Sequence, residues 1–146
     1  MKWQRGEYEV DTDPARIDIE TTHAFLTADA YWSPGVPRDV VERSIANSLN
    51  FGLYKGSEQA GFTRVVSDMA TFAWICDVFV LPEHRGQGLG KFLMECVTTH
   101  PELQGLRRMV LATRDAHGLY GQYGFHELDD PTKYMIRRDV LSYPHG

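Results

Sequence analysis

The residues with the clearest chemical potential form a short glycine-rich segment, RGQGLGK, at positions 85–91. It follows an apolar stretch and precedes apolar residues at helical spacing, which places it between a strand and a helix. Free N–H groups at a helix start, together with the positive end of the helix dipole, bind phosphate. Glycine lets the backbone approach a ligand closely, and Arg85 and Lys91 add positive charge. An ordinary strand-to-helix turn needs only one glycine, so the segment predicts a phosphate-bearing ligand.

Two common phosphate-binding motifs do not match this spacing. The pattern GxxxxGK[ST] needs glycine at position 85 and Ser or Thr at position 92, where the chain has Arg85 and Phe92. The dinucleotide pattern GxGxxG needs glycine at position 91, which is Lys91, and an acidic residue about 20 residues further on. Residues 104–108 supply no such acid. Neither a P-loop nor a dinucleotide fold is therefore predicted.

The pattern that remains, R/Q-x-x-G-x-G/A, resembles that of the GCN5-related N-acetyltransferase (GNAT) superfamily. The resemblance rests on VFVLPEHRGQGLGKFL and, later in the chain, on ATRDAHGLYGQYGF. The second segment resembles a family signature of alanine, tyrosine and then glycine-phenylalanine. Both signatures occur in the family's order, and the resemblance extends over essentially the whole chain.

This resemblance implies acetyl-CoA as the acyl donor. In the family, the strand before the glycine loop splays from its neighbour and offers backbone groups to the pantetheine arm, and the loop holds the pyrophosphate. Thr113 stands where many members place an asparagine near the cofactor. The cofactor-binding residues implied in this way are Val78, Phe79, Val80, Arg85, Gly86, Gln87, Gly88, Leu89, Gly90, Lys91 and Thr113.

The implied reaction is direct attack of an amine on the acetyl thioester. It needs an oxyanion-stabilising backbone N–H, expected near Val78, and a proton for the departing thiolate. Tyr120 stands at the signature tyrosine, and its hydroxyl suits a general acid. The alternative is that Tyr120 is a core residue of an apolar helix.

The group that deprotonates the amine stays open. Many members carry a glutamate on the strand before the loop, and Trp74 occupies that register here. Asp77 is the nearest carboxylate on the same strand and a candidate catalytic residue. Strand alternation, however, points the Asp77 side chain to the face opposite Val78. On that face the carboxylate would pair with an arginine. His84, His117 or water are the other candidates.

Tyr31 and Trp32 are the candidate acceptor-binding residues. They begin the loop YWSPGVP between the first two predicted helices, which edge the acceptor cleft in this family. Aromatic side chains there can form a wall for an amine, by shape or by a cation–π contact. Trp32 could equally anchor the loop to the core.

The resemblance thus predicts an acetyl-CoA-dependent N-acetyltransferase acting on a primary amine of a small molecule or a peptide. The alternative is a non-catalytic sensor or interaction module that binds CoA or acyl-CoA. It stays open because Trp74 replaces the glutamate that many members carry at this position. The protein is expected to be a monomer or a homodimer.

The elements that must position these residues follow from hydrophobic periodicity. Their order, β-α-α-β-β-β-α-β-α-β-β, predicts an α+β fold (α/β/α) with about four helices on a mixed, mostly antiparallel sheet of about seven strands. This order matches the GNAT fold that the resemblance implies. Strands are expected at residues 7–11, 51–55, 59–67, 70–80, 107–112, 125–128 and 132–137. Helices are expected from Asp18, at 38–49, from Leu89 to before Pro101, and at 115–123.

Length and composition limit the number of domains and the classes of partner. The chain has 146 residues, and 15 basic against 20 acidic side chains give a net charge of −5. That size favours one domain, residues 1–146, and the acidic balance argues against nucleic acid as a partner. Cys76 and Cys96 lack CxxC spacing, so neither metal binding nor a disulfide is expected. With no signal peptide and no stretch long enough to cross a membrane, we expect a cytoplasmic protein.

Overall fold

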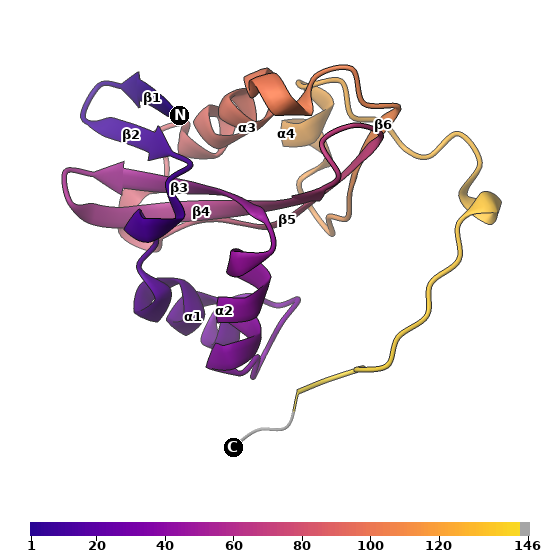
Figure 1. Ribbon diagram of the computed structural model, residues 1–146, viewed down its shortest axis with the longest axis horizontal. Coiled ribbons are helices and arrows are strands. Elements are labelled where there is room, and N and C mark those ends of the chain that lie inside the picture. Colours follow the sequence, from indigo (N-terminus) through magenta and orange to yellow (C-terminus); the bar gives the residue numbers. More distant parts are fainter. Residues whose placement is uncertain (144–146) are drawn as a thin grey trace.

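The computed structural model describes residues 1–143. A central six-stranded sheet follows the chain in order (Figure 1). It consists of β1 (Lys2–Arg5), β2 (Tyr8–Asp11), β3 (Leu49–Lys55), β4 (Glu58–Ser67), β5 (Phe72–Val80) and β6 (Arg108–Leu111). All neighbours are antiparallel except β5 and β6, which are parallel. A parallel pair needs a crossover, and the segment between these two strands supplies a helix.

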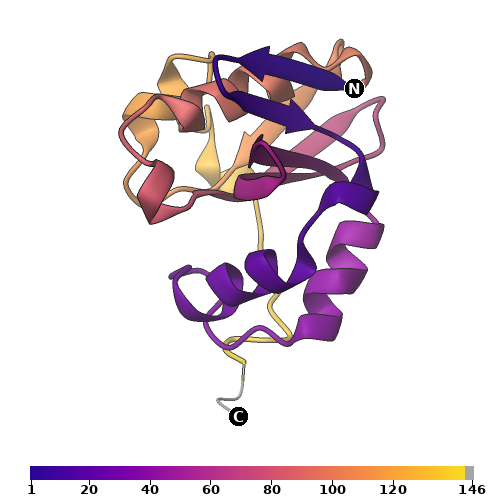
Figure 2. The ribbon, with the colours of Figure 1, turned by 90° about the vertical axis from the view of Figure 1, so that its left-hand side faces the viewer.

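Helices cover both faces of the sheet. The first two, α1 (Ile19–Ala28) and α2 (Arg38–Ala46), lie on one face. The crossover helix α3 (Leu89–Thr99) and the short α4 (His117–Gly121) lie on the other, as Figure 2 also shows. This layered arrangement confirms the predicted α+β class.

Each face of the sheet has its own apolar core. The α3 side includes Phe51, Leu53, Phe92 and Leu93, all nearly inaccessible to solvent. Burial of side chains of this size stabilises a fold by roughly 1.5–3 kcal/mol each. On the other side the rings of Phe25 and Phe79 stack with centroids 4.1 Å apart. The two cores fix β5 from both faces, so its position relative to the helices is well defined.

Helix α1 begins where the sequence predicts. The Asp18 carboxylate accepts a hydrogen bond from the backbone N–H of Thr21, at 3.1 Å, and so caps the helix. This backbone hydrogen bond is the main reason that the pKa of Asp18 lies below its usual value. The capping residue thus fixes the point at which α1 begins after β2.

The amino-terminal hairpin extends beyond the prediction. The sequence predicts one strand there, at residues 7–11, but residues 2–5 also form a strand, joined to β2 through Gly6 in the left-handed region (φ +57°). The indole ring of Trp3 lies 5.8 Å from the ring of Phe51. Through this contact β1 contributes a side chain to the core. The mostly polar sequence of residues 2–5 does not predict such a contact.

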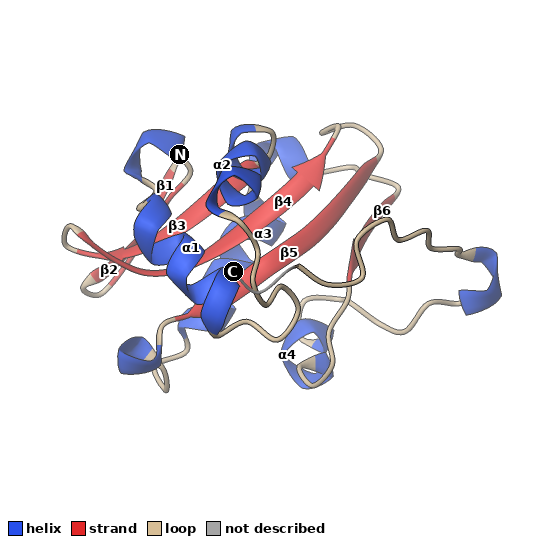
Figure 3. Ribbon diagram, turned by 90° about the horizontal axis from the view of Figure 1, so that it is seen from below, coloured by secondary structure: helices blue, strands red, loops and turns tan. Residues whose placement is uncertain are grey.

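The carboxy-terminal third corrects the prediction of about seven strands. Neither residues 125–128 nor 132–137 are strands, and within residues 125–143 the chain forms only a short 3-10 turn at Pro131–Lys133. It runs away from the sheet (Figures 1 and 3). The apolar composition is that of a strand, but a strand also needs a backbone partner, and β6 is only four residues long. Helix 115–123 is likewise shorter, because Gly118 and Gly121 weaken helix formation.

Candidate functional site

The sheet opens between β5 and β6. Pairing runs from Phe72–Arg108 to Ile75–Leu111, where β6 ends, while β5 continues to Val80. The two chains then diverge around a cleft of about 510 Å³. Its lining comes from both strands, from the loop after α1 and from the start of α4: Tyr31, Trp32, Trp74, Ile75, Cys76, Asp77, Val78, Leu111, Ala112, Thr113, Arg114, Asp115, Ala116 and Tyr120.

A β-bulge shapes the β5 side of this cleft. Phe62 pairs with Phe79 and Arg64 with Cys76, so β5 has one residue more than β4 between these pairs. Asp77 lies there with φ +55°, a left-handed backbone that non-glycine residues seldom adopt. Asp77 contacts Trp32 and Arg64 on the side of α1 and α2, whereas Val78 packs against the core on the side of α3. The two side chains thus lie on opposite faces as expected, and Asp77 pairs with an arginine, although both residues line the cleft.

Both carboxylate oxygens of Asp77 have partners. Oδ2 accepts from Nε of Arg64 at 2.8 Å, and Oδ1 accepts from the indole N–H of Trp32 at 3.0 Å. The Arg64 and Asp77 side chains are 17% and 12% exposed, so the ion pair is mostly buried. Sequence reasoning does not identify Arg64 as the partner. The sequence feature that could have predicted this pair is a single basic residue within β4 and a single acidic residue within the next strand, β5.

The glycine loop owes its shape to two residues in the left-handed region, Gly86 (φ +82°) and Gly88 (φ +75°). A Cβ at either position would meet no atom within 4 Å, so conformation rather than space requires glycine. Gly88 is the N-cap of α3 and offers no side chain to the first turn. The N–H groups at this helix start therefore remain available to an anion.

The remaining loop residues turn partly toward the protein. Leu89 is buried, Gly90 packs beside Leu119, and Lys91 is exposed, with its carbonyl accepting from the hydroxyl of Tyr123 at 2.9 Å. The Nε of Arg85 donates to the carbonyl of Val80 at 2.8 Å. This bond ties the loop to the end of β5.

A buried polar network supports the loop from behind. The side-chain amide of Gln87 donates to the Tyr8 hydroxyl and to the His84 carbonyl, both at 3.2 Å. The Tyr8 hydroxyl lies 2.9 Å from Nδ1 of His84, whose Nε2 lies 3.5 Å from Glu58. Gln87 therefore points inward and has only its backbone N–H to offer a phosphate. His84 belongs to this network and is not among the described residues that line the cleft.

The apolar end of β5 divides its side chains between core and cleft. Phe79 is buried against Phe25, so only its backbone can face a cofactor. Val78 is partly buried and lines the cleft. The carbonyl of Val80 already accepts from Arg85. Of the three predicted pantetheine contacts, Val78 is the one that borders open space.

Tyr120 lines the cleft, is only 9% exposed and belongs to the apolar core on the side of α3. It also lines a second cavity, of about 630 Å³, which includes His117 and Phe125. Burial raises the pKa of Tyr120, so its hydroxyl stays protonated well into the alkaline range. Among residues 1–143 no hydrogen-bond partner occupies that hydroxyl. It is a proton donor facing the cleft without a competing acceptor.

Thr113 and Tyr31 brace the cleft from two sides. The Thr113 hydroxyl accepts from the Ala116 N–H at 3.0 Å, which orders the turn leading into α4. The Tyr31 hydroxyl accepts from the Arg114 N–H at 3.2 Å, and the Arg114 guanidinium lies 3.8 Å from the Tyr31 ring centroid. The rings of Tyr31 and Trp32 meet edge to face at 5.1 Å, and both stay partly exposed. The loop after α1 thus reaches across the sheet to the segment after β6.

Neither a metal cluster nor a membrane-spanning helix occurs in the described part of the chain. Nowhere in residues 1–143 do three His, Cys, Asp or Glu side chains converge as metal ligands do. Each helix there is too short, or too polar, to cross a bilayer.

Comparison with known proteins identifies the family. The model of the acetyltransferase (GNAT) domain matches residues 47–127, more than half of the chain. A Gibberella zeae protein, provisionally named an acetyltransferase, is 34% identical over 84% of this chain and 80% of its own length. A Xanthomonas campestris crystal structure described as belonging to the GNAT family is 48% identical, with a TM-score of 0.90 over 92% of this chain and 95% of that one. The chain belongs to the GNAT family of acetyltransferases.

More distant matches add two details about other members. The alanine N-acetyltransferase of ribosomal protein bS18 from Escherichia coli is 32% identical over 62% of this chain and 64% of that enzyme. A Clostridium acetobutylicum structure with acetyl-CoA is 13% identical, with a TM-score of 0.65 over 94% of this chain and 98% of that one, and so shares the fold. Enzymes of this family use acetyl-CoA.

Proposed function

We propose that this protein transfers the acetyl group of acetyl-CoA to a primary amine of a small molecule or a peptide, by direct attack within the β5–β6 cleft. The observation that carries the proposal is the combination of this cleft with the uncapped start of α3. The first accommodates an extended thioester arm, and the second offers backbone donors to its pyrophosphate. Backbone N–H groups of residues 87–90 and the charges of Arg85 and Lys91 hold the anion.

Bond changes in the reaction are balanced within the cleft. The neutral amine nitrogen forms a bond to the acetyl carbon, a backbone N–H near Val78 stabilises the oxyanion, and the C–S bond then breaks. Tyr120 gives its proton to the departing thiolate, the nitrogen loses its extra proton to water as the amide forms, and solvent water returns a proton to the Tyr120 phenolate. The pKa of Tyr120, raised by burial, keeps that proton in place until the leaving group needs it.

Asp77 holds the cleft in shape rather than removing the amine proton. Its oxygens accept hydrogen bonds from Arg64 and Trp32, which hold the carboxylate between β4 and the loop after α1. We assign deprotonation of the amine to water. The bond from Trp32 to Asp77 makes the indole both an anchor of the loop and part of the acceptor wall, beside Tyr31.

Peptide amines belong in the acceptor screen for a specific reason. The relative from Escherichia coli is named for an alanine of a ribosomal protein, and it aligns over 62% of this chain. An amino-terminal alanine peptide, a lysine side-chain amine and small polyamines therefore cover the two acceptor classes. Release of CoA thiol, followed by mass measurement of the acceptor, reports turnover. Binding of acetyl-CoA without turnover on any amine would favour the non-catalytic alternative.

The cofactor assignment has a matched pair of glycine variants. Gly88 and Gly105 both have φ above +70° and open space where a Cβ would lie, but Gly105 lies beyond the far end of α3. Replacing either with valine should cost a similar stability, about 1–3 kcal/mol. Only Gly88→Val should abolish acetyl-CoA binding in calorimetric titration. Equal affinity in the two folded variants would remove the loop from the cofactor site.

A further inference from the structure

Arg114 brings a guanidinium group to the catalytic cleft from the segment that follows β6. The residue is exposed, and no carboxylate in residues 1–143 forms an ion pair with it, not even that of Asp115, the next residue in the chain. Arg64, by contrast, is paired with Asp77 at 2.8 Å. An arginine side chain is always charged. The cleft therefore contains a cation that has no ion-pair partner in the described part of the protein.

Two contacts with Tyr31 hold Arg114 in place. The Tyr31 hydroxyl accepts a hydrogen bond from the backbone N–H of Arg114 at 3.2 Å, and the guanidinium lies 3.8 Å from the centroid of the Tyr31 ring. Stacking on a ring covers one face of the planar guanidinium and leaves its edge, which carries the N–H donors, available to a ligand. Two of these donors match the two oxygens of a carboxylate or a phosphate. The side chain is thus ordered to bind an oxyanion before any ligand arrives.

The contact between Tyr31 and Arg114 lies near the proposed reaction centre. Both residues line the same cleft as Val78 and Tyr120. Burial is the main reason that the pKa of Tyr120 is raised, and Tyr31 and Asp115 contribute to the same rise, so both lie close enough to act on its hydroxyl. A group bound by Arg114 therefore belongs to a molecule that reaches the reacting atoms.

We propose that Arg114 binds an oxyanion of the amine acceptor, a carboxylate or a phosphate group, and so selects amines that carry an anionic substituent. The inference rests on the proposed function, which brings an amine acceptor to the cleft. The phosphates of acetyl-CoA have their own cations, Arg85 and Lys91, around the start of α3. Arg114 lies instead beside Tyr31, on the acceptor side of the cleft. The acceptor then extends from its oxyanion at Arg114 to its amine near Tyr120.

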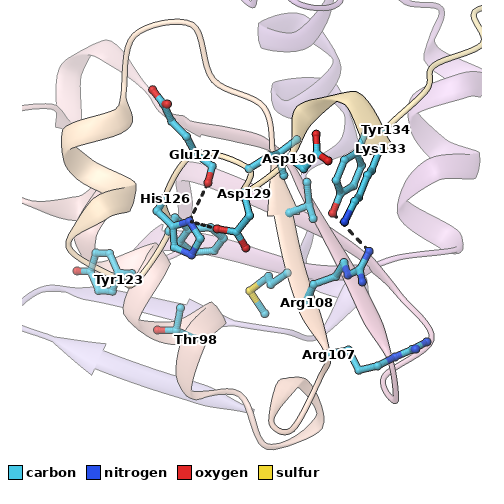
Figure 4. Close-up of a pocket in the computed structure, with 15 residues that line it drawn as sticks. Thr98, Arg107, Arg108, Tyr123, His126, Glu127, Asp129, Asp130, Lys133 and Tyr134 are labelled. Carbon is cyan, nitrogen blue, oxygen red and sulfur yellow. Dashed lines mark hydrogen bonds and ion pairs between the residues drawn. The ribbon is translucent and has the colours of Figure 1, made fainter.

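A separate cavity supplies a matched control. It has a volume of about 670 Å³, and its lining includes Arg107 and Arg108 (Figure 4). Arg108 donates to the hydroxyl of Tyr134 at 3.4 Å. Arg107 is exposed and, like Arg114, has no ion pair within the described residues, but it does not line the catalytic cleft. Replacing Arg107 thus removes the same charge from a different place.

Two matched pairs of amines test the proposal on the full chain: β-alanine against propylamine, and phosphoethanolamine against ethanolamine. The readout is the ratio of kcat/KM within each pair, measured by thiol release at saturating acetyl-CoA. Comparing this ratio between proteins cancels the intrinsic reactivity of the amines. The wild type should favour the anionic member of at least one pair. Arg114→Met should reduce that ratio by about 10-fold to 100-fold, mainly through KM, because it removes charge-assisted hydrogen bonds.

Two further variants separate the guanidinium from charge alone. Arg107→Met should keep the wild-type ratio. Arg114→Lys retains the positive charge without the planar group, and should restore only part of the ratio that Arg114→Met loses. The pair of amines whose ratio depends on Arg114 identifies the oxyanion as a carboxylate or a phosphate. Circular dichroism confirms that each variant is folded.

Other results overturn the proposal. Turnover without a preference for an anionic amine, or a preference that Arg114→Met leaves unchanged, would remove Arg114 from the acceptor site while the proposed function stands. An equal loss on all the amines would mean that Arg114 only braces Tyr31, and an equal fall of the ratio in Arg107→Met would mean an effect of overall charge. If no amine reacts, the proposed function fails, and calorimetric titration of the CoA-bound protein with β-alanine and phosphoethanolamine decides. Binding that Arg114→Met abolishes supports the oxyanion site, and the absence of binding overturns it.

Discussion

The hydroxyl of Tyr120 has no described hydrogen-bond partner, so its removal should affect chemistry more than packing. Tyr120→Phe keeps the ring and its edge-to-face contact with Phe125 at 6.1 Å. Turnover should fall by about 10² to 10⁴, the range for loss of a general acid, while acetyl-CoA affinity and Tm stay nearly unchanged. Near wild-type turnover would contradict the assignment.

The same residue predicts the alkaline limb of the pH profile. A general acid works only below its pKa, and burial raises the pKa of Tyr120 above the usual value of about 10. The fall of kcat at high pH should therefore lie above that value. In Tyr120→Phe this limb should disappear from the residual activity, which a purely structural effect would not achieve.

The ion pair between Asp77 and Arg64 should behave as a structural unit. Asp77→Asn leaves the guanidinium of Arg64 mostly buried without its counter-charge, and we expect a loss of about 3 kcal/mol. Arg64→Met should cost a similar amount, and the double variant much less than the sum, in urea unfolding of all three. If Asp77 were instead the base, Asp77→Asn would abolish turnover while Arg64→Met retained it.

Tyr54 is a buried tyrosine whose hydroxyl has no partner among the described residues. Its ring lies under the Arg16 guanidinium, 4.1 Å from the centroid, and crosses Gly52, where a Cβ would overlap the hydroxyl. Burial raises the pKa of this phenol, because ionisation there is unfavourable. Tyr54→Phe removes an unsatisfied group and should stabilise the protein by about 1 kcal/mol, seen as a rise in Tm by calorimetry. A lower Tm would show that the hydroxyl is satisfied in solution.

At the scale of elements, the glycine loop depends on β2 as well as on α3. Tyr8, in β2, links Gln87 of the loop to His84 through its hydroxyl. Tyr8→Phe should destabilise the protein by about 1 kcal/mol, in contrast to Tyr54→Phe, because it breaks satisfied hydrogen bonds. It should also weaken acetyl-CoA binding several-fold in titration, since the loop loses support. Unchanged affinity would show that backbone conformation alone holds the loop.

Local sequence signals predict those elements whose partners lie nearby in the chain. The capping carboxylate of Asp18, the apolar spacing after Leu89 and the β-branched and aromatic composition of β3 to β5 predict helices and strands close to those observed. The glycine loop is also predictable, since its residues are consecutive. The bulge at Asp77 is not, because an extra residue in one strand is visible only against its pairing with the next.

The carboxy-terminal elements could not be predicted from periodicity. Residues 132–137 have the composition of a strand, but pairing is a property of two segments, and the pattern of one cannot say where the other lies. The partners of candidate site residues escape sequence reasoning for the same reason. Arg64 and Arg114 lie far from Asp77 and Tyr31 in the chain, and the folded structure brings each pair together.

At the scale of the whole molecule, the separation of β5 and β6 opens a cleft that can be reached from both faces of the sheet. Tyr31 and Trp32 reach the cleft from the side of α1, whereas Tyr120 reaches it from α4 on the opposite face. In the proposed reaction the thioester arm enters from the start of α3 and the amine from the side of α1, so the two substrates reach the cleft from different sides. This separation allows both substrates to be present at once.

The uncapped start of α3 has a practical consequence for the purified protein. Because no side chain caps its first N–H groups, we expect small oxyanions in the buffer to bind at the proposed pyrophosphate site. An anion present at its own Kd adds about 0.4 kcal/mol to stability, so melting temperatures in phosphate should exceed those in an amine sulfonate buffer of equal ionic strength. At the proposed site the same phosphate should compete with acetyl-CoA and raise its apparent KM. Kinetic constants measured in phosphate would therefore understate the affinity of the enzyme for its thioester.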